Sequence, residues 1–211
     1  NNKTEYVELR TGEKLALYVE GTIMSNTDIV SYNEMSAKAL KELHNSDLQF
    51  NEYNAFERLD TYEKYCTDLG FTHPQEYVDL RNRLDAMRDT YKDIKHVPCH
   101  CDYQPTNLVI DGDKLYILDW EFAGMHPYLS SLARLIAHGE EQEDAFFHMK
   151  EEDRAFAIDY YYRHLLQYKG IAYDDYRMAL DYFLLYEYCE WIMLGIRYND
   201  TQSERYIRYR A

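Results

Sequence analysis

The sequence predicts a mainly α-helical fold with one small β-hairpin near its centre. Apolar residues recur at helical spacing in several long segments, and glycine, proline or asparagine separates these segments. In one place two short β-rich runs flank the turn Asp111-Gly112-Asp113, which is typical of a hairpin. A chain of 211 residues is long enough to bury one sizeable core. We therefore expect one largely helical domain.

The first half of the chain is predicted to hold one strand and three helices. The strand covers Lys14–Val19 and ends at Gly21. The helices are amphipathic, and they cover Asp28–His44 behind a cap at Asn26 or Thr27, Asn54–Leu69 before Gly70, and Pro74–Tyr91.

The second half begins with the hairpin and returns to helices after Pro127. The hairpin strands are Asn107–Ile110 and Lys114–Leu118. The three helices expected after it cover Leu129–His138, Glu151–Tyr168 and Asp174–Arg197. The loops at the hairpin are where we expect chemistry, because binding and catalytic residues concentrate on loops that a rigid scaffold positions.

The composition excludes several classes of function. A net charge of −15 argues against a nucleic-acid partner, because neutralising phosphates requires clustered Lys and Arg. The charge would steer cationic ligands toward the protein, or it is simply a solvated acidic surface. No apolar run approaches the length of a membrane span, and no secretion signal is evident.

The four cysteines are too few and too scattered for a disulfide framework, so we expect a cytoplasmic protein. A zinc site at Cys99-His100-Cys101 is disfavoured because no second ligand pair follows at zinc spacing.

The informative stretch is His100-Cys101-Asp102-Tyr103-Gln104-Pro105-Thr106-Asn107, followed by the hairpin and then by Asp119-Trp120-Glu121. Phosphoryl transfer needs a carboxylate at the attacking hydroxyl and oxygen ligands for magnesium. Asp102 can orient the hydroxyl and accept its proton, while Asn107 and Asp119 can offer an amide and a carboxylate oxygen to the metal. The alternative is a surface hairpin whose Asp and Asn residues only cap turns.

The same stretch resembles the choline/ethanolamine kinase and aminoglycoside phosphotransferase families, whose shared loop has the pattern His-x-Asp-x-x-x-x-Asn before a strand that ends in Asp. Gln104 makes it more similar to the choline kinases, and the run Asp119–Met125 resembles the bacterial choline kinases in particular. The resemblance implies a protein-kinase-like fold, ATP and Mg²⁺ as cofactors, and a choline-like small-molecule substrate. Gln104 and Glu121 would then support the hydroxyl or the metal.

The resemblance extends back to a hinge strand that contacts adenine, which would place Leu17 and Val19 at the nucleotide. Residues 1–21 are then a remnant of the amino-terminal lobe with its hinge strand, and residues 22–211 are the helical carboxyl-terminal lobe. Only about fourteen residues precede the strand, too few for the sheet and helix of a nucleotide-covering lobe. We expect that lobe to be largely absent, and this piece alone to be poorly active.

A choline site requires aromatic rings and carboxylates, because a quaternary ammonium is held by cation–π attraction. The last helix offers Tyr188 and Trp191, three residues apart, with Glu187 beside them. Aromatic residues on this helix are more often core than cage, and the neighbours Tyr182, Phe183 and Tyr186 share that ambiguity.

Two residues depart from the family pattern. Ser131 stands where relatives have an aspartate that braces the catalytic loop, and Arg134 would repel choline unless it is paired. The sequence therefore leaves two alternatives to a choline kinase. One is a degenerate kinase-like domain that binds an amine without catalysis, and the other is a phosphotransferase for another hydroxyl substrate such as an aminoglycoside. The oligomeric state is not predicted.

Overall fold

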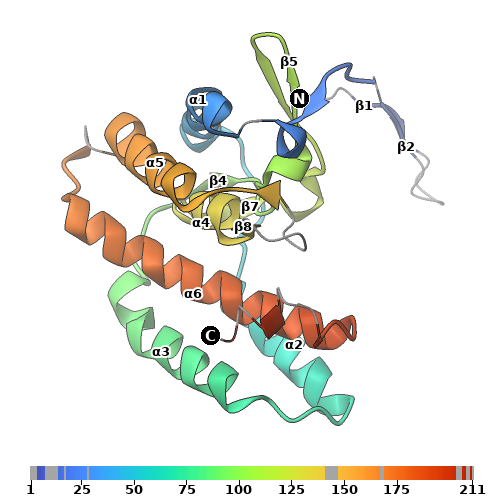
Figure 1. Ribbon diagram of the computed structural model, residues 1–211, viewed down its shortest axis with the longest axis vertical. Helices are drawn as coiled ribbons and strands as arrows, with labels where there is room; N and C mark the ends of the chain where they lie inside the picture. Colours follow the sequence, from blue (N-terminus) through green and yellow to red (C-terminus); the bar gives the residue numbers. More distant parts are fainter. Residues whose placement is uncertain are drawn as a thin grey trace.

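The computed structural model describes residues 4–7, 14–16, 18–27, 29–140, 147–166, 169–202, 206–207 and 210. The fold is mainly helical with small sheets, as the sequence predicts. Helix α6 (Tyr173–Arg197) crosses the middle of the molecule and contacts α2 (Ala55–Asp68) and α3 (Gln75–Tyr91) on one side and α4 (Ser130–Ala137) on the other (Figure 1). Helices α1 (Asn33–His44) and α5 (Glu151–Tyr161) pack beyond α4.

Helix α2 illustrates how closely local signals set the helix bounds. Asn54 is its N-cap, and its side-chain oxygen accepts a hydrogen bond of 3.1 Å from the backbone N–H of Glu57. Pro74 precedes α3 as predicted, and α6 begins at Tyr173, one residue before the expected start. Helix α5 ends at Tyr161 and continues as a π-helix over Tyr162–Leu166, while residues 167–168 lie outside the described chain.

The predicted cap of the first helix is wrong. Helix α1 begins only at Asn33, after a 3₁₀ segment over Ile29–Tyr32, and Asp28 lies outside the described residues. The backbone N–H and the hydroxyl of Thr27 both donate to the carbonyl of Met24, closing an earlier 3₁₀ turn. This hydroxyl is therefore committed to the turn before it and does not cap the helix after it.

The hairpin is confirmed, with strands β5 (Leu108–Asp111) and β6 (Lys114–Ile117) in antiparallel register. Gly112 supplies the left-handed conformation of the tight turn with φ +60°. A short strand, β3 (Thr22–Ile23), adds to the other edge of β5.

The sequence did not predict strands β4 (His96–Cys99) and β7 (Gly124–Pro127). One precedes the hairpin in the chain and the other follows it, and the two pair antiparallel with each other. Each strand is four residues long and contains a proline, so neither shows the alternation of apolar and polar residues that would identify a strand in the sequence. Two further small pairs are β1 (Thr4–Val7) with β2 (Lys14–Ala16), and β8 (Gly139–Glu140) with β9 (Phe147–His148). The predicted strand Lys14–Val19 is shorter than expected, because Tyr18 and Val19 are not in a strand and Leu17 lies outside the described residues.

The core is built around α4 and α6. Every residue of α4 is buried, and α6 buries thirteen of its side chains. Burial of α4 encloses not only apolar residues but also Ser131 and Arg134, which must then find polar partners inside the protein. Among the described residues, no helix combines the length and the apolar composition that a membrane span requires.

Candidate active site

The catalytic loop predicted from the sequence lies between β4 and β5, with His100 as its anchor. The His100 side chain is fully buried, and its Nε2 lies 2.7 Å from the carbonyl oxygen of Leu118, the residue before Asp119. Trp120 packs edge-on against the same ring at 4.8 Å. Burial lowers the pKa of His100, so the ring is neutral near pH 7. The histidine thereby joins the start of the loop to the strand that leads to Asp119.

Asp102, Gln104 and Asn107 come together within this loop. The side-chain amide of Asn107 donates to Oδ2 of Asp102 at 2.8 Å and to the Asp102 carbonyl at 3.0 Å. Gln104 Nε2 lies 3.3 Å from the same carboxylate oxygen. The Asp102 side chain keeps 18% of its surface exposed. A carboxylate fixed by two amides yet open to solvent is suitably placed to receive the proton of a substrate hydroxyl.

Asn107 and Asp119 lie at the same end of the hairpin. The backbone N–H of Leu118 donates to the Asn107 carbonyl at 2.9 Å, so Asp119 is the next residue after the last paired position. Asp119 adopts a left-handed conformation (φ +60°, ψ +62°), which is uncommon for a residue other than glycine and is found at functional sites. The Asp119 and Glu121 side chains are both exposed.

The donor chemistry of this end of the hairpin fits magnesium. Both hydrogen bonds that hold the Asn107 amide use its nitrogen, so its oxygen points elsewhere and can bind a cation. Within the described part of the chain, no three His, Cys, Asp or Glu side chains converge as metal ligands. Mg²⁺ normally keeps several waters and binds through one or two carboxylates together with substrate phosphates, so this sparse set suits it.

A buried ion-pair network lies directly behind Asp102. Arg134 Nη1 is 3.2 Å from Glu187 and its Nη2 is 2.8 Å from Glu190, while its Nε is 3.8 Å from Asp102. Arg58 reaches Glu190 from α2 at 2.6 Å. Arg134 is therefore paired with carboxylates, the arrangement in which it would not be expected to repel a cation. Sequence reasoning missed Arg58 and Glu190. A usable signal was present, because Glu187 and Glu190 lie three residues apart in the otherwise apolar stretch 182–196 of α6.

Burial is the largest cause of the pKa shifts of Glu187 and Glu190. It raises the pKa of Glu187 to about 7, against the opposing attraction of Arg134. Burial also raises the pKa of Glu190, although Arg134 and Arg58 both oppose the shift. Charges removed from water lose hydration that nearby cations only partly replace.

Two residues of the expected choline cage, Glu187 and Trp191, lie beside the same arginine. Glu187 is buried, pairs with Arg134 and lies 3.4 Å from His138 Nε2. The Trp191 ring is 4.5 Å from the His138 ring and 5.6 Å from Cζ of Arg134. Tyr188 and Trp191 are partly buried and pack against the core. The neighbouring aromatics Tyr182, Phe183 and Tyr186 are buried core residues.

Ser131 belongs to a buried polar cluster behind the loop. Its hydroxyl lies 3.5 Å from Nε2 of His44, and the Cys99 thiol is 3.8 Å from the same nitrogen. Burial lowers the pKa of His44 to about 3, so this cluster is uncharged. Ser131, which replaces the aspartate of the family pattern, thus makes a neutral contact to α1.

For the predicted nucleotide contacts, only Val19 can be placed, since Leu17 lies outside the described residues. Val19 is partly buried and precedes Gly21, which packs tightly on the hairpin: a Cβ at Gly21 would meet the Ile110 carbonyl oxygen at 2.4 Å. This close approach holds the segment that carries Val19 against the hairpin.

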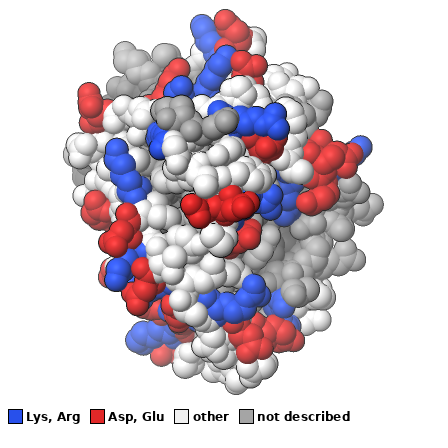
Figure 2. Space-filling model, turned by 90° about the vertical axis from the view of Figure 1, so that its left-hand side faces the viewer, with Lys and Arg blue, Asp and Glu red and all other residues white. Residues whose placement is uncertain are grey.

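The charge of the surface is mixed. On the face shown in Figure 2, acidic and basic side chains are interspersed and do not gather into one patch of a single sign. This face therefore fits the solvated-surface interpretation of the net charge of −15.

Comparison with known proteins supports the fold and the family. Protein LicA from Haemophilus influenzae is 29% identical over 174 residues, which cover 76% of this chain and 47% of that protein. A choline/ethanolamine kinase family protein from Mesorhizobium loti superposes with a TM-score of 0.76 at 22% identity, covering 99% of this chain and 72% of that one. The structure of LicA in complex with AMP superposes with a TM-score of 0.71 at 18% identity, covering 99% and 71%. At these identities the structural likeness shows the fold alone.

The chain spans 47% and 60% of the length of the two Haemophilus influenzae relatives that it matches. The sequence model of the phosphotransferase enzyme family matches residues 12–166, a range that includes the catalytic loop, the hairpin and Arg134. The chain therefore belongs to the phosphotransferase enzyme family.

Proposed function

We propose that the protein transfers the γ-phosphoryl group of ATP to the hydroxyl of a small amino-alcohol, with choline as the first candidate. The observation that carries the proposal is the 2.8 Å hydrogen bond between Asn107 and Asp102 at the base of the hairpin. It joins a candidate base to a candidate metal ligand in one rigid loop. We assign residues 22–211 to the carboxyl-terminal lobe of a protein-kinase-like fold and residues 1–21 to the remnant of its amino-terminal lobe and hinge.

Asp102 would orient the substrate hydroxyl and accept its proton as the oxygen attacks phosphorus. Gln104 would hold the same carboxylate or the hydroxyl. The Asn107 oxygen, Asp119 and, in support, Glu121 would bind Mg²⁺, and Leu17 and Val19 would contact adenine. When bound, the metal would neutralise charge on the phosphates. Nucleotide use is supported by the fold likeness to the AMP complex of LicA.

Choline leads the substrate list because of the relatives and because of the aromatic helix. The chain resembles LicA, and a solved structure of similar fold is described as a choline kinase. Tyr188 and Trp191 would supply ring faces, and Glu187 a carboxylate, for a quaternary ammonium. Arg134 is already paired with two glutamates, which reduces its repulsion of a cation.

A second candidate is a domain that binds an amine without phosphoryl transfer. Arg134 favours it, because a guanidinium 3.8 Å from Asp102 can pair with the carboxylate that would otherwise contact the substrate hydroxyl. A phosphotransferase for another hydroxyl compound, such as an aminoglycoside, would use the same loop with a different substrate pocket.

The decisive assay restores the amino-terminal lobe and measures phosphocholine formation from ATP, Mg²⁺ and choline, with ethanolamine and kanamycin as alternative acceptors. We expect Asp102→Asn to lower kcat by about two to four powers of ten, the usual contribution of general-base catalysis. Asp111→Asn is the matched control, because Asp111 is exposed at the far end of the same hairpin.

Full activity of Asp102→Asn would refute the assigned base. Calorimetry that detects choline but not Mg-ATP would establish the non-catalytic alternative. Phosphorylation of kanamycin without formation of phosphocholine would mean that the substrate is an aminoglycoside-like hydroxyl compound.

A further inference from the structure

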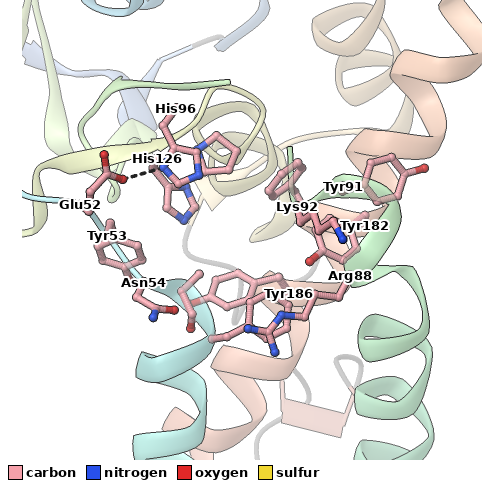
Figure 3. A pocket seen from close by; sticks show the side chains of 14 residues that line it. Glu52, Tyr53, Asn54, Arg88, Tyr91, Lys92, His96, His126, Tyr182 and Tyr186 are labelled. Atoms are coloured by element: carbon pink, nitrogen blue, oxygen red, sulfur yellow. Dashed lines mark hydrogen bonds and ion pairs between the residues drawn. The ribbon is translucent and has the colours of Figure 1, made fainter. Parts of the chain in front are cut away.

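A pocket of about 350 Å³ lies away from the catalytic loop, between the start of α2, the end of α3, the middle of α6 and the β4–β7 pair (Figure 3). Its walls are mostly aromatic and include Tyr91 of α3 and Tyr182, Phe183 and Tyr186 of α6. The volume falls at the lower end of the range for small-molecule sites.

The pocket is separate from the proposed active site. In the β4–β7 pair, Cys99 pairs with Gly124 at the end that adjoins the catalytic loop, and His96 pairs with Pro127 at the opposite end. The pocket is lined by His96, His126 and Pro127, and so lies at the end away from Asp102.

The charged groups around the pocket favour an anion. Arg88 and Lys92 line it from the end of α3. The Arg88 guanidinium lies 4.0 Å from the centre of the Phe56 ring and has no carboxylate partner among the described residues. Among the described residues that line the pocket, only Glu52 carries a carboxylate, and it is already paired with His96 at 2.8 Å. Lys92 has only an exposed contact with Asp89, at 3.5 Å, which solvent weakens.

A buried polar atom marks the opposite wall. His126 lines the pocket with only 4% of its surface exposed, and its Nδ1 has no hydrogen-bond partner among the described residues. Burial lowers the pKa of His126 to about 3, so the ring is neutral. An unsatisfied buried nitrogen costs stability, which a polar group of a ligand would recover. In Figure 3 the two histidines lie on one side of the pocket, and Tyr91, Lys92 and Tyr182 lie on the other.

We propose that this pocket binds a small, flat aromatic acid. Its carboxylate pairs with Arg88 and Lys92, its ring packs among the tyrosines, and a hydroxyl at its other end hydrogen-bonds to His126. Ring stacking and a charge-assisted hydrogen bond supply the affinity, and the two polar ends fix the orientation.

The test uses 4-hydroxybenzoate as the ligand, with 4-hydroxybenzyl alcohol as its uncharged analogue and tyramine as its cationic analogue. Binding is measured on the protein by NMR shifts of labelled histidine and tyrosine side chains. With about ten non-hydrogen atoms, 4-hydroxybenzoate is expected to bind with a Kd on the order of 1 mM and to shift the His126 ring signals. The two analogues are expected to bind about ten-fold more weakly, the cost of losing a hydrogen bond to a charged group.

Arg88→Met should raise the Kd for 4-hydroxybenzoate by about ten-fold. Arg83→Met, the same change at an exposed position of α3 that does not line the pocket, should leave the Kd within about two-fold. Four results would each overturn the proposal. They are binding of either analogue that is as tight as that of 4-hydroxybenzoate or tighter, an equal loss of affinity in the two variants, NMR shifts confined to the catalytic loop, and no binding at a ligand concentration about 20-fold above the expected Kd.

Discussion

Replacing Glu187 by glutamine tests the buried network behind the catalytic loop. Glu187 is 3% exposed, and burial raises its pKa from an ordinary 4.5 to about 7 despite the nearby Arg134. Glutamine has nearly the same shape as a protonated glutamate and can still hydrogen-bond to Arg134 or His138. Glu187→Gln therefore removes the ionisation of this group while largely preserving the packing.

The sign of the effect follows from the raised pKa. Between pH 4.5 and pH 7 the folded wild-type protein binds more protons at Glu187 than the unfolded chain does, so stability falls as the pH rises through this window. The loss in the free energy of unfolding caused by ionising Glu187 approaches about 3 kcal/mol above pH 7, and it is below about 1 kcal/mol at pH 5. We expect Glu187→Gln to be within about 1 kcal/mol of wild type at pH 5 and about 2–3 kcal/mol more stable at pH 8.

Equilibrium unfolding in urea, followed by tryptophan fluorescence at both pH values and one ionic strength, measures the difference. Titrating groups outside the Arg134 network are shared, so they largely cancel between variant and wild type. Asp181→Asn, the corresponding carboxylate-to-amide change at an exposed position of α6, is the control. A variant less stable than wild type by more than about 1 kcal/mol at pH 8 would mean that Arg134 holds Glu187 ionised with net benefit, and the reasoning would fail.

Three further changes test the loop and the hairpin. Asn107→Ala removes both amide hydrogen bonds to Asp102, so we expect a loss of about 1–3 kcal/mol in urea unfolding and a raised KM for Mg-ATP in the kinase assay. Gly124→Ala places a Cβ 2.8 Å from the Cβ of Tyr53, and the overpacking should cost about 1–3 kcal/mol, seen as a lower Tm. Gly112→Ala forces a side chain into φ +60° with open space around it, so calorimetry should show a smaller loss of about 1–2 kcal/mol, from backbone strain alone.

The sequence alone determined the features that depend on neighbouring residues. Helix α2 was predicted nearly to the residue because Asn54 caps it and Gly70 follows it, and both signals act within one turn. The hairpin was predicted because Asp111-Gly112-Asp113 specifies a tight turn between two β-rich runs. The loop that joins Asp102 to Asn107 was likewise evident, since its two ends are only five positions apart in the chain.

Tertiary structure decided what depends on residues far apart in the chain. Arg134 and Glu190 meet across 56 positions, and no local pattern predicts which helices will pack together. Strands β4 and β7 are too short to show alternation and exist because the chain returns beside itself after the hairpin. The pocket at Arg88 and His126 has the same origin, because its walls come from helices and strands that only the packed core brings together.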